Sequence, residues 1–343
     1  MFLDLSSWTL AASIALFTGC ALVIAVFGTR ITGVVDQLAD RTGVGEAVAG
    51  AILLGAATSL SGSVLSVTAA WNGHPTLAVS NAIGGIAVQT VFLAVADLFY
   101  RRANLEHAAA SAPNMLQNAL LIALLSLILL GPITPDISLY SIHPVSIVLL
   151  VFYIYGIKLV QRAWNQPMWQ PSRTRETRED KPEQRNTRIS LSRLWGEFLI
   201  LMAILGIAGW WLEPAAANIA RDTGLDETAV GILLTAISTS IPELVTSVAA
   251  VRRGALTLAV GGIIGGNAFD TLFTAASDIA YRDGSIYHHI SEQTIVWLVL
   301  TLLMAAVLMM GQIRRQEHGP GGIGFESSGV MVIYLVGIVL MFI

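Results

Sequence analysis

The stretch Thr257-Leu258-Ala259-Val260, followed by Ile264-Gly265-Gly266, repeats an earlier one, Thr76-Leu77-Ala78-Val79 followed by Ile83-Gly84-Gly85, with the same spacing inside each copy. The offset that relates these two stretches also superimposes residues 43–98 on residues 224–279 without a gap, and 23 of the 56 pairs are identical. Shared apolar composition raises such a score, but it does not explain the Gly-Gly matches. The chain is therefore predicted to contain an internal duplication.

The composition predicts a membrane protein. The 343 residues are 55% hydrophobic and only 12% charged, with a mean hydropathy of +0.70. A water-soluble domain cannot bury that much apolar surface. The net charge of −4 argues against nucleic acid as a partner, and leaves the lipid bilayer as the expected surroundings.

Ten apolar stretches are long enough to cross the roughly 30 Å of hydrocarbon in a bilayer. They are residues 8–28, 45–70, 76–99, 114–131, 139–161, 194–212, 227–250, 255–280, 292–311 and 328–343. The only long polar segment lies between the fifth and sixth stretches and is typical of a solvated linker. We therefore expect a first five-helix repeat over residues 1–163, a linker over 164–192 and a second five-helix repeat over 193–343.

The positive charges agree with ten spans. If loops alternate between the two sides, 17 of the 19 basic residues fall on one side, and only Arg221 and Arg282 on the other. Positive charge collects on the cytoplasmic side, which predicts an inner-membrane, multi-pass protein with a cytoplasmic linker and two extracytoplasmic termini. Five spans per repeat is an odd number, so the second repeat enters from the opposite face. The predicted fold class is an all-α membrane protein with ten transmembrane helices in two inverted repeats, an arrangement that in secondary transporters places the substrate site between the repeats. A bundle duplicated for structural reasons alone is the alternative.

Two acids lie deep within the predicted spans, Glu243 and Asp270. A carboxylate at membrane depth costs roughly 2.5–3.5 kcal/mol on insertion scales, so it normally faces a partner, a cavity or an ion. Pro242 removes a backbone donor beside Glu243, and we expect it to open the helix locally. Freed carbonyls with the hydroxyls of Thr239 and Ser240 would then suit a hard cation. Structural acids bonded to neighbouring helices are the alternative.

The second repeat resembles a known family. The run Ser238-Thr239-Ser240-Ile241-Pro242-Glu243-Leu244-Val245-Thr246-Ser247, with Leu258 to Asp270 after it, is similar to the second α-repeat of the sodium/calcium exchangers, part of the calcium:cation antiporter superfamily. The resemblance covers nearly the whole chain. It implies that Thr239, Ser240, Glu243 and Asp270 line the ion sites, together with Asn267 of the same glycine-rich motif.

The first repeat matches the family less closely. Thr58 and Ser59 are retained, and Gln89 takes the place of Asp270. Ser61 stands where the family has proline, and Gly62 where it has an acid. Gly85 and Ile86 replace a serine and an asparagine. The resemblance implies that this repeat contributes hydroxyls, carbonyls and an amide, but no charge.

The leading hypothesis is a secondary active antiporter that exchanges Ca²⁺ for Na⁺ or H⁺ by alternating access. It needs inorganic cations as substrates and no cofactor. One alternative keeps the transporter but changes the ion to monovalent cations, protons or another divalent metal. A second is a non-transporting sensor derived from an exchanger. An enzyme is not expected, because no histidine lies well inside a span.

The remaining polar residues receive simpler interpretations. Asp97 and Asp278 fall at the ends of spans and are expected to be solvated. The isolated histidines His74, His107, His143 and His318 are expected to be exposed.

Overall fold

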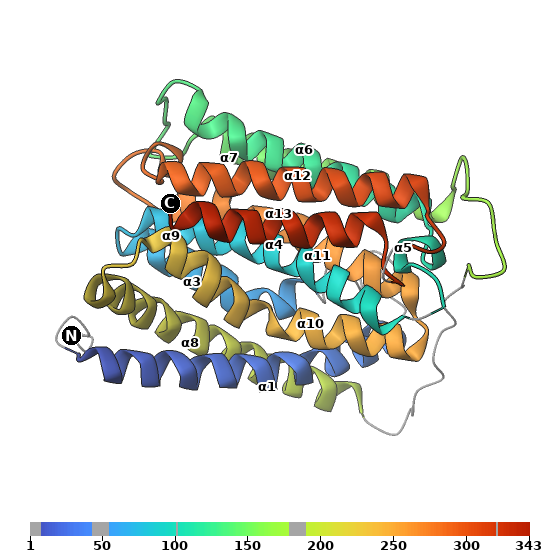
Figure 1. The fold of residues 1–343 in the computed structure, drawn as a ribbon. Helices are drawn as coiled ribbons and strands as arrows, with labels where there is room; N and C mark the ends of the chain where they lie inside the picture. Colours follow the sequence, from blue (N-terminus) through green and yellow to red (C-terminus); the bar gives the residue numbers. More distant parts are fainter. Residues whose placement is uncertain (1–7, 43–54, 101, 178–189, 320–321) are drawn as a thin grey trace.

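The computed structural model describes residues 8–42, 55–100, 102–177, 190–319 and 322–343 (Figure 1). The regular structure in these ranges is helical, which confirms the all-α prediction, and the only β-type pairing there is an isolated bridge between Leu139 and Ile142. The elements are α1 (Leu10–Thr42), α3 (Leu60–Trp71), α4 (Pro75–Phe99), α5 (Leu105–Ala108), α6 (Ala112–Ile133), α7 (Pro144–Asn165), α8 (Leu191–Thr223), α9 (Glu227–Ala229), the π-helix η2 (Val230–Thr235), α10 (Ala236–Arg253), α11 (Leu256–Ala280), the 3-10 helix η3 (Ile286–His288), α12 (Glu292–Arg314) and α13 (Phe325–Met341).

The helices have the lengths that a membrane requires. Within the described ranges, eight segments are long and apolar enough to span, and α3 and α13 are shorter apolar helices. The first part of predicted span 45–70 lies outside the described residues. Two predicted ends are wrong: α1 continues from residue 28 to Thr42, and α8 continues from residue 212 to Thr223.

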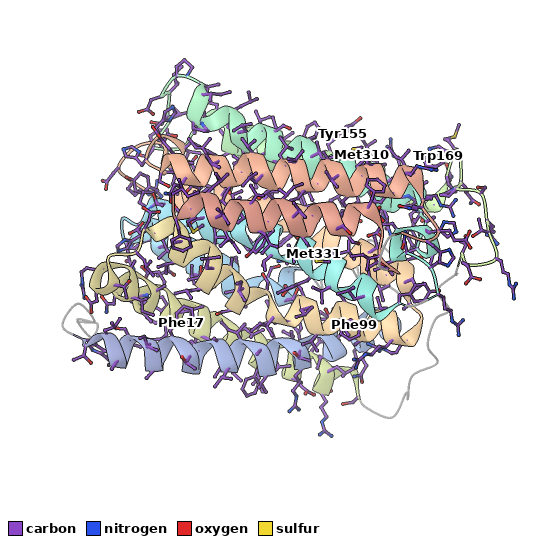
Figure 2. The ribbon with its side chains drawn as sticks, viewed as in Figure 1. Phe17, Phe99, Tyr155, Trp169, Met310 and Met331 are labelled. Atoms are coloured by element: carbon purple, nitrogen blue, oxygen red, sulfur yellow. The ribbon has the colours of Figure 1, made fainter. Side chains whose placement is uncertain are left out.

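Apolar side chains cover the outer surface of the bundle. Tyr155 on α7 and Met310 on α12 point outward and are 57% and 58% exposed (Figure 2). On α1, Leu22 and Val26 are equally exposed. Such a surface matches lipid and not water. The chain is a multi-pass membrane protein.

The two halves make the same helix contacts. α1 and α8 lie side by side and run in opposite directions (Figure 1). Gly28 of α1 packs directly on Pro242 of α10, and Gly209 of α8 packs directly on Ser61 of α3. The offset between the sequence repeats carries Gly28 onto Gly209 and Ser61 onto Pro242, so the sequence repeat is also a repeat of packing.

The bundle has two ends, named here after the short helices that lie there: the α5 end and the η3 end. At the α5 end, Asp97 accepts hydrogen bonds from Leu105 N (2.7 Å), Gly324 N (3.2 Å) and Ser327 Oγ (2.9 Å). At the η3 end, Asp278 accepts from Ile286 N (3.1 Å), His143 N (2.7 Å) and Ser146 Oγ (2.7 Å). Every donor in the second set is the repeat counterpart of a donor in the first.

The expectation that Asp97 and Asp278 are solvated is therefore wrong. Both side chains are fully buried, because three donors replace water around each carboxylate. The expectation of exposed histidines is also wrong for two residues: His107 is bonded to Arg315 O and Thr174 Oγ1, and His143 lies at the start of α7.

The most enclosed helices are α4 and α11. Residues 77–90 of α4 are all buried, since α3, α10, α11, α12 and α13 pack around it. Close approach depends on glycine: Gly84 faces the backbone of Ile232, and Gly231 faces Ser80. The π-helix lies at this crossing, and Thr235 at its end donates to Asn81 Oδ1 (2.8 Å). The candidate site lies between these helices.

Candidate cation site

Glu243 projects from a continuous helix. The expected opening at Pro242 is absent, because α10 runs unbroken from Ala236 to Arg253. The Thr239 hydroxyl donates to Thr235 O within its own chain segment (2.9 Å). Glu243 is 7% exposed, and the Thr58 hydroxyl is the side-chain donor beside its carboxylate. A buried carboxylate with so few donors is costly, so this group is suited to hold a proton or a cation.

Asp270 on α11 meets Gln89 on α4. The Gln89 amide nitrogen donates to Asp270 Oδ2 (2.7 Å) and lies 3.4 Å from Ser240 Oγ. Asp270 Oδ1 and Gln89 Oε1 have no partner, although both residues are only 2% exposed. These two free oxygens can face a bound ion.

The other predicted residues lie around these two acids. Thr58 lines the same pocket as Glu243, and Ser59 lies next to Asp270. Asn267 donates to Thr90 Oγ1 (3.0 Å) and leaves its own Oδ1 without a partner. All eight residues predicted from sequence are at most 7% exposed: Thr58, Ser59, Gln89, Thr239, Ser240, Glu243, Asn267 and Asp270. The structure gathers them in one region, with Thr239 turned toward its own helix backbone.

Gly62 marks the place of the missing acid. It is the counterpart of Glu243, and a Cβ built on it would lie 3.3 Å from Cε2 of Phe273 and 3.6 Å from Thr239 Oγ1. Phe273 lies three residues after Asp270 on α11, and its identity with its repeat counterpart Phe92 is the signal in the sequence that could have marked it. The aromatic ring stands where the first repeat would otherwise carry a longer side chain.

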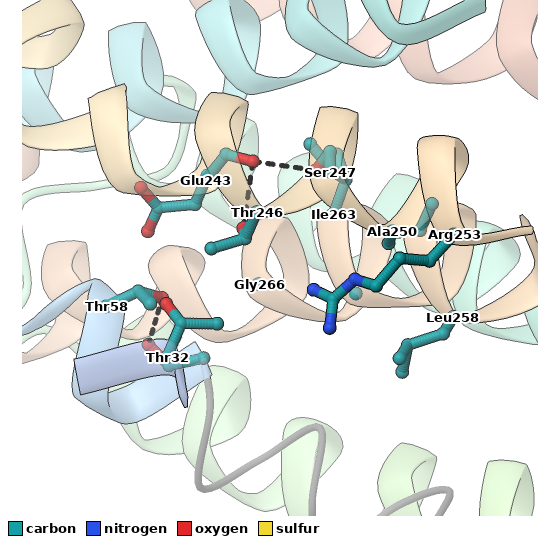
Figure 3. Close-up of a pocket in the computed structure, with 13 residues that line it drawn as sticks. Thr32, Thr58, Glu243, Thr246, Ser247, Ala250, Arg253, Leu258, Ile263 and Gly266 are labelled. Atoms are coloured by element: carbon teal, nitrogen blue, oxygen red, sulfur yellow. Dashed lines mark hydrogen bonds between the residues drawn. The ribbon is translucent and has the colours of Figure 1, made fainter. Parts of the chain in front are cut away.

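A pocket leads away from Glu243 along α10 toward Arg253 (Figure 3). Its lining includes Thr32 of α1 and Gly266 of α11. Figure 3 shows Thr58 and Thr32 on one side of the Glu243 carboxylate, with Arg253 toward the far end of the lining. The sequence did not point to Thr32, because it lies beyond the predicted end of the first span. Arg253 was considered only as one of the positive charges that indicate which side of the membrane a loop faces.

The donor set is made of oxygen. Among the described residues, no group of three or more His, Cys, Asp or Glu side chains could hold a metal ion. The candidate site instead offers two carboxylates together with amide and hydroxyl oxygens. Oxygen donors suit hard cations such as Ca²⁺ and Na⁺ rather than soft transition metals.

Comparison with known proteins agrees with this donor set. A family model described as "Sodium/calcium exchanger protein" matches residues 12–159 and 193–343. The chain belongs to the sodium/calcium exchanger family. The two matched stretches leave out the central polar segment.

Several known proteins resemble the chain along nearly its whole length. The inner membrane protein YrbG of Escherichia coli (strain K12) is 25% identical over 328 residues, covering 95% of this chain and 96% of YrbG. Among solved structures, the H⁺/Ca²⁺ exchanger CAX matches with a TM-score of 0.70 and 13% identity over 96% of this chain and 82% of CAX. The sodium-calcium exchanger NCX_Mj matches with a TM-score of 0.61 and 16% identity over 96% of this chain and 99% of NCX_Mj. The chain therefore shares the fold of these two solved exchangers.

Proposed function

We propose that the protein is a secondary active cation antiporter that exchanges Ca²⁺ for Na⁺ or H⁺ by alternating access. The observation that carries the proposal is the buried Glu243 carboxylate, which has few hydrogen-bond donors around it and lines a pocket. Membership of an exchanger family and the fold shared with the H⁺/Ca²⁺ exchanger CAX and the sodium-calcium exchanger NCX_Mj support it. In this proposal Glu243 and Asp270 hold the ion.

The charge of the two acids fits an exchange. Two ionised carboxylates neutralise one divalent cation, or two monovalent cations or protons. The site then carries no net charge in either loaded state, which lowers the cost of moving it through a low-dielectric region. Neutral ligands come from Thr58, Ser59 and Gln89 of the first repeat and from Thr239, Ser240 and Asn267 of the second.

The proposal includes a topology. The chain spans an inner membrane ten times as two inverted five-helix repeats, residues 1–163 and 193–343, joined by a cytoplasmic linker over residues 164–192. Both termini are extracytoplasmic. The pocket between Glu243 and Arg253 then faces the cytoplasm, because Arg253 belongs to the side that collects positive charge.

A second candidate function is exchange of monovalent cations or protons, or of another divalent metal. One observation favours it: the amide nitrogen of Gln89 donates a hydrogen bond to Asp270 Oδ2. The first repeat therefore places a hydrogen-bond donor where a divalent ion needs an oxygen ligand. A non-transporting sensor would bind the ion without moving it.

Uptake in proteoliposomes tests these functions. The protein is reconstituted and supplied with Ca²⁺, Mg²⁺, Mn²⁺, Na⁺ or H⁺ gradients, one at a time. We expect Ca²⁺ uptake driven by an opposed Na⁺ or H⁺ gradient, and its loss in Glu243→Gln and Asp270→Asn. Glu292→Gln, an exposed acid at the start of α12, is the matched control and keeps full flux. Wild-type flux in Glu243→Gln would remove this residue from the site, and binding without flux would favour the sensor.

A further inference from the structure

The α5 end contains two buried glutamates that the transport site does not use. Glu106 is 2% exposed and Glu326 is fully buried. Apart from the backbone N–H of Glu106 itself, no N–H or O–H group of the described residues donates to their four carboxylate oxygens. The Glu326 side chain packs directly on Gly311 and Gly324, which have no side chains to displace it.

Asp97 brings the two glutamates together. It accepts from Leu105 N, next to Glu106, and from Ser327 Oγ, next to Glu326. The start of α5 and the start of α13 are thereby held on one carboxylate, and the carboxyl groups of Glu106 and Glu326 lie within hydrogen-bonding reach of each other. Two carboxylates are both acceptors, so they can bond only if one of them carries a proton.

The η3 end shows that the scaffold does not require acids. The repeat counterparts of Glu106 and Glu326 are Tyr287 and Val145. There the Tyr287 hydroxyl lies 2.9 Å from Ser146 Oγ, and the equivalent carboxylate Asp278 keeps its three donors. The same junction is built once with a neutral filling and once with two acids.

No described cation compensates the glutamates. In the described part of the chain, no ion pair reaches Asp97, Glu106 or Glu326. The charged groups of the neighbouring elements have other partners: Arg315 at the end of α12 donates to Ser172 O (2.6 Å), and Arg252 of α10 lies over the Phe99 ring. His107 of α5 is bonded to Arg315 O and Thr174 Oγ1, and Glu317 lies on the exposed loop after α12.

Burial, with the charges of Asp97 and Glu326 nearby, raises the pKa of Glu106 well above its usual range.

We propose that Glu106 and Glu326 form a carboxyl pair that binds one proton and, while it holds it, locks α5 to α13. Loss of the proton places two charges side by side next to Asp97, and their repulsion separates the helices. The lock is connected to the transport region, since α13 packs on α4 and α5 packs on α11. Those helices carry Gln89 and Asp270.

The protonated carboxyl pair determines whether the stability of the protein rises or falls with pH. An acid that is protonated more readily in the folded state stabilises the fold at low pH and loses that contribution as pH rises through its folded-state pKa. We therefore expect the melting temperature of the protein in detergent to fall as the pH is raised from neutral. In Glu106→Gln the neutral amide removes this titration, and the pH-dependent fall is smaller than in the wild type by the contribution of the pair.

Infrared spectroscopy provides the direct test. The background is Glu243→Gln with Asp270→Asn, which removes the acids of the candidate cation site and makes the result independent of transport. We expect the C=O stretch of a protonated carboxyl at neutral pH, and its loss in both Glu106→Gln and Glu326→Gln. Glu317→Gln, an exposed acid of the same end, leaves the band unchanged.

Three results would overturn the proposal. One is a band that is absent in the background protein, and another is a band that survives in Glu106→Gln. The third is loss of the band when Ca²⁺ is added at neutral pH, which would make the pair a metal site instead. If the single variants do not fold, Glu106→Tyr combined with Glu326→Val copies the filling of the η3 end, and the same loss of the band is expected.

Discussion

Gln89 and Asp270 occupy equivalent positions in the two repeats and meet in the structure, with the Gln89 amide nitrogen 2.7 Å from Asp270 Oδ2. Residues that are equivalent under an inverted repeat can touch each other only close to the axis that relates the two halves. The contact therefore lies close to that axis, in the buried interior of the bundle. Gly85 and Gly266, themselves equivalent, lie beside it.

Gln89→Glu is predicted to strengthen divalent binding. It replaces an amide with a second acid against Asp270, and the added negative charge favours a doubly charged ion over a singly charged one. We expect the Ca²⁺ concentration for half-maximal uptake to fall by on the order of tenfold, or about 1.4 kcal/mol. Na⁺ competition in the same vesicles measures the selectivity. Gln89→Leu is the control and should weaken binding, and an unchanged Ca²⁺-to-Na⁺ preference in Gln89→Glu would contradict the assignment of Gln89.

Gly62→Glu is predicted to be destabilising unless Phe273 is shortened. The ring of Phe273 stands 3.3 Å from where a Cβ would be, and overfilling a packed region costs typically about 1–3 kcal/mol. Thermal unfolding in detergent should show a loss for Gly62→Glu and a recovery for Gly62→Glu with Phe273→Ala. Purely additive effects of the two changes would show that the ring and residue 62 do not compete for the same space.

Gly209→Ala is predicted to disturb the packing of α8 on α3. A Cβ at residue 209 would collide with the backbone of Ser61, which cannot move aside as a side chain can. Gly206→Ala, one turn earlier on α8, meets only Leu60 Cδ2 at 3.8 Å and should have little effect. We expect a drop in melting temperature, equivalent to roughly 1–3 kcal/mol, for Gly209→Ala only. Equal melting temperatures in the two variants would refute the close contact.

The His74–Glu227 pair is predicted to make stability depend on pH at the η3 end. His74 Nδ1 lies 2.6 Å from Glu227 Oε1, and this hydrogen bond raises the pKa of His74 above its usual value. A raised histidine pKa stabilises the fold at low pH, and the contribution disappears as pH rises through the folded-state value. Melting curves below and above neutral pH should differ less in His74→Gln than in the wild type. The exposed His318→Gln is the control, and a pH dependence that His74→Gln leaves intact would assign the effect elsewhere.

The arrangement of helices is largely predictable from the sequence, but the ends of two helices are not. A hydropathy pattern predicts that a span ends where the first charged residue appears, and Arg30 is the first charged residue after the first apolar stretch. In the structure Arg30 lies within α1 and pairs with Glu197 of α8 (2.6 Å). The partner comes from the other repeat, and no local pattern shows it. The long contact between α1 and α8 keeps both helices intact beyond their apolar stretches.

The acids of the candidate site are identifiable because a charge inside an apolar stretch is costly. Not all of the neutral groups around these acids can be identified from the sequence. Phe273 and Thr32 reach the region only through the crossing of helices, which single-sequence periodicity does not contain. For the same reason the sequence alone places Asp97 and Asp278 in water: most of the donors around each come from segments distant in the sequence.

The two Asp-anchored junctions share their donors but differ in what fills them, Glu106 and Glu326 at one end, Tyr287 and Val145 at the other. A carrier with identical halves would rest equally often open to either side, since the two open forms would be equal in energy. Unequal ends remove that degeneracy. The resting population is then skewed toward one orientation, and in the proposed proton lock the acidity of the compartment that bathes the α5 end sets how strongly it is skewed.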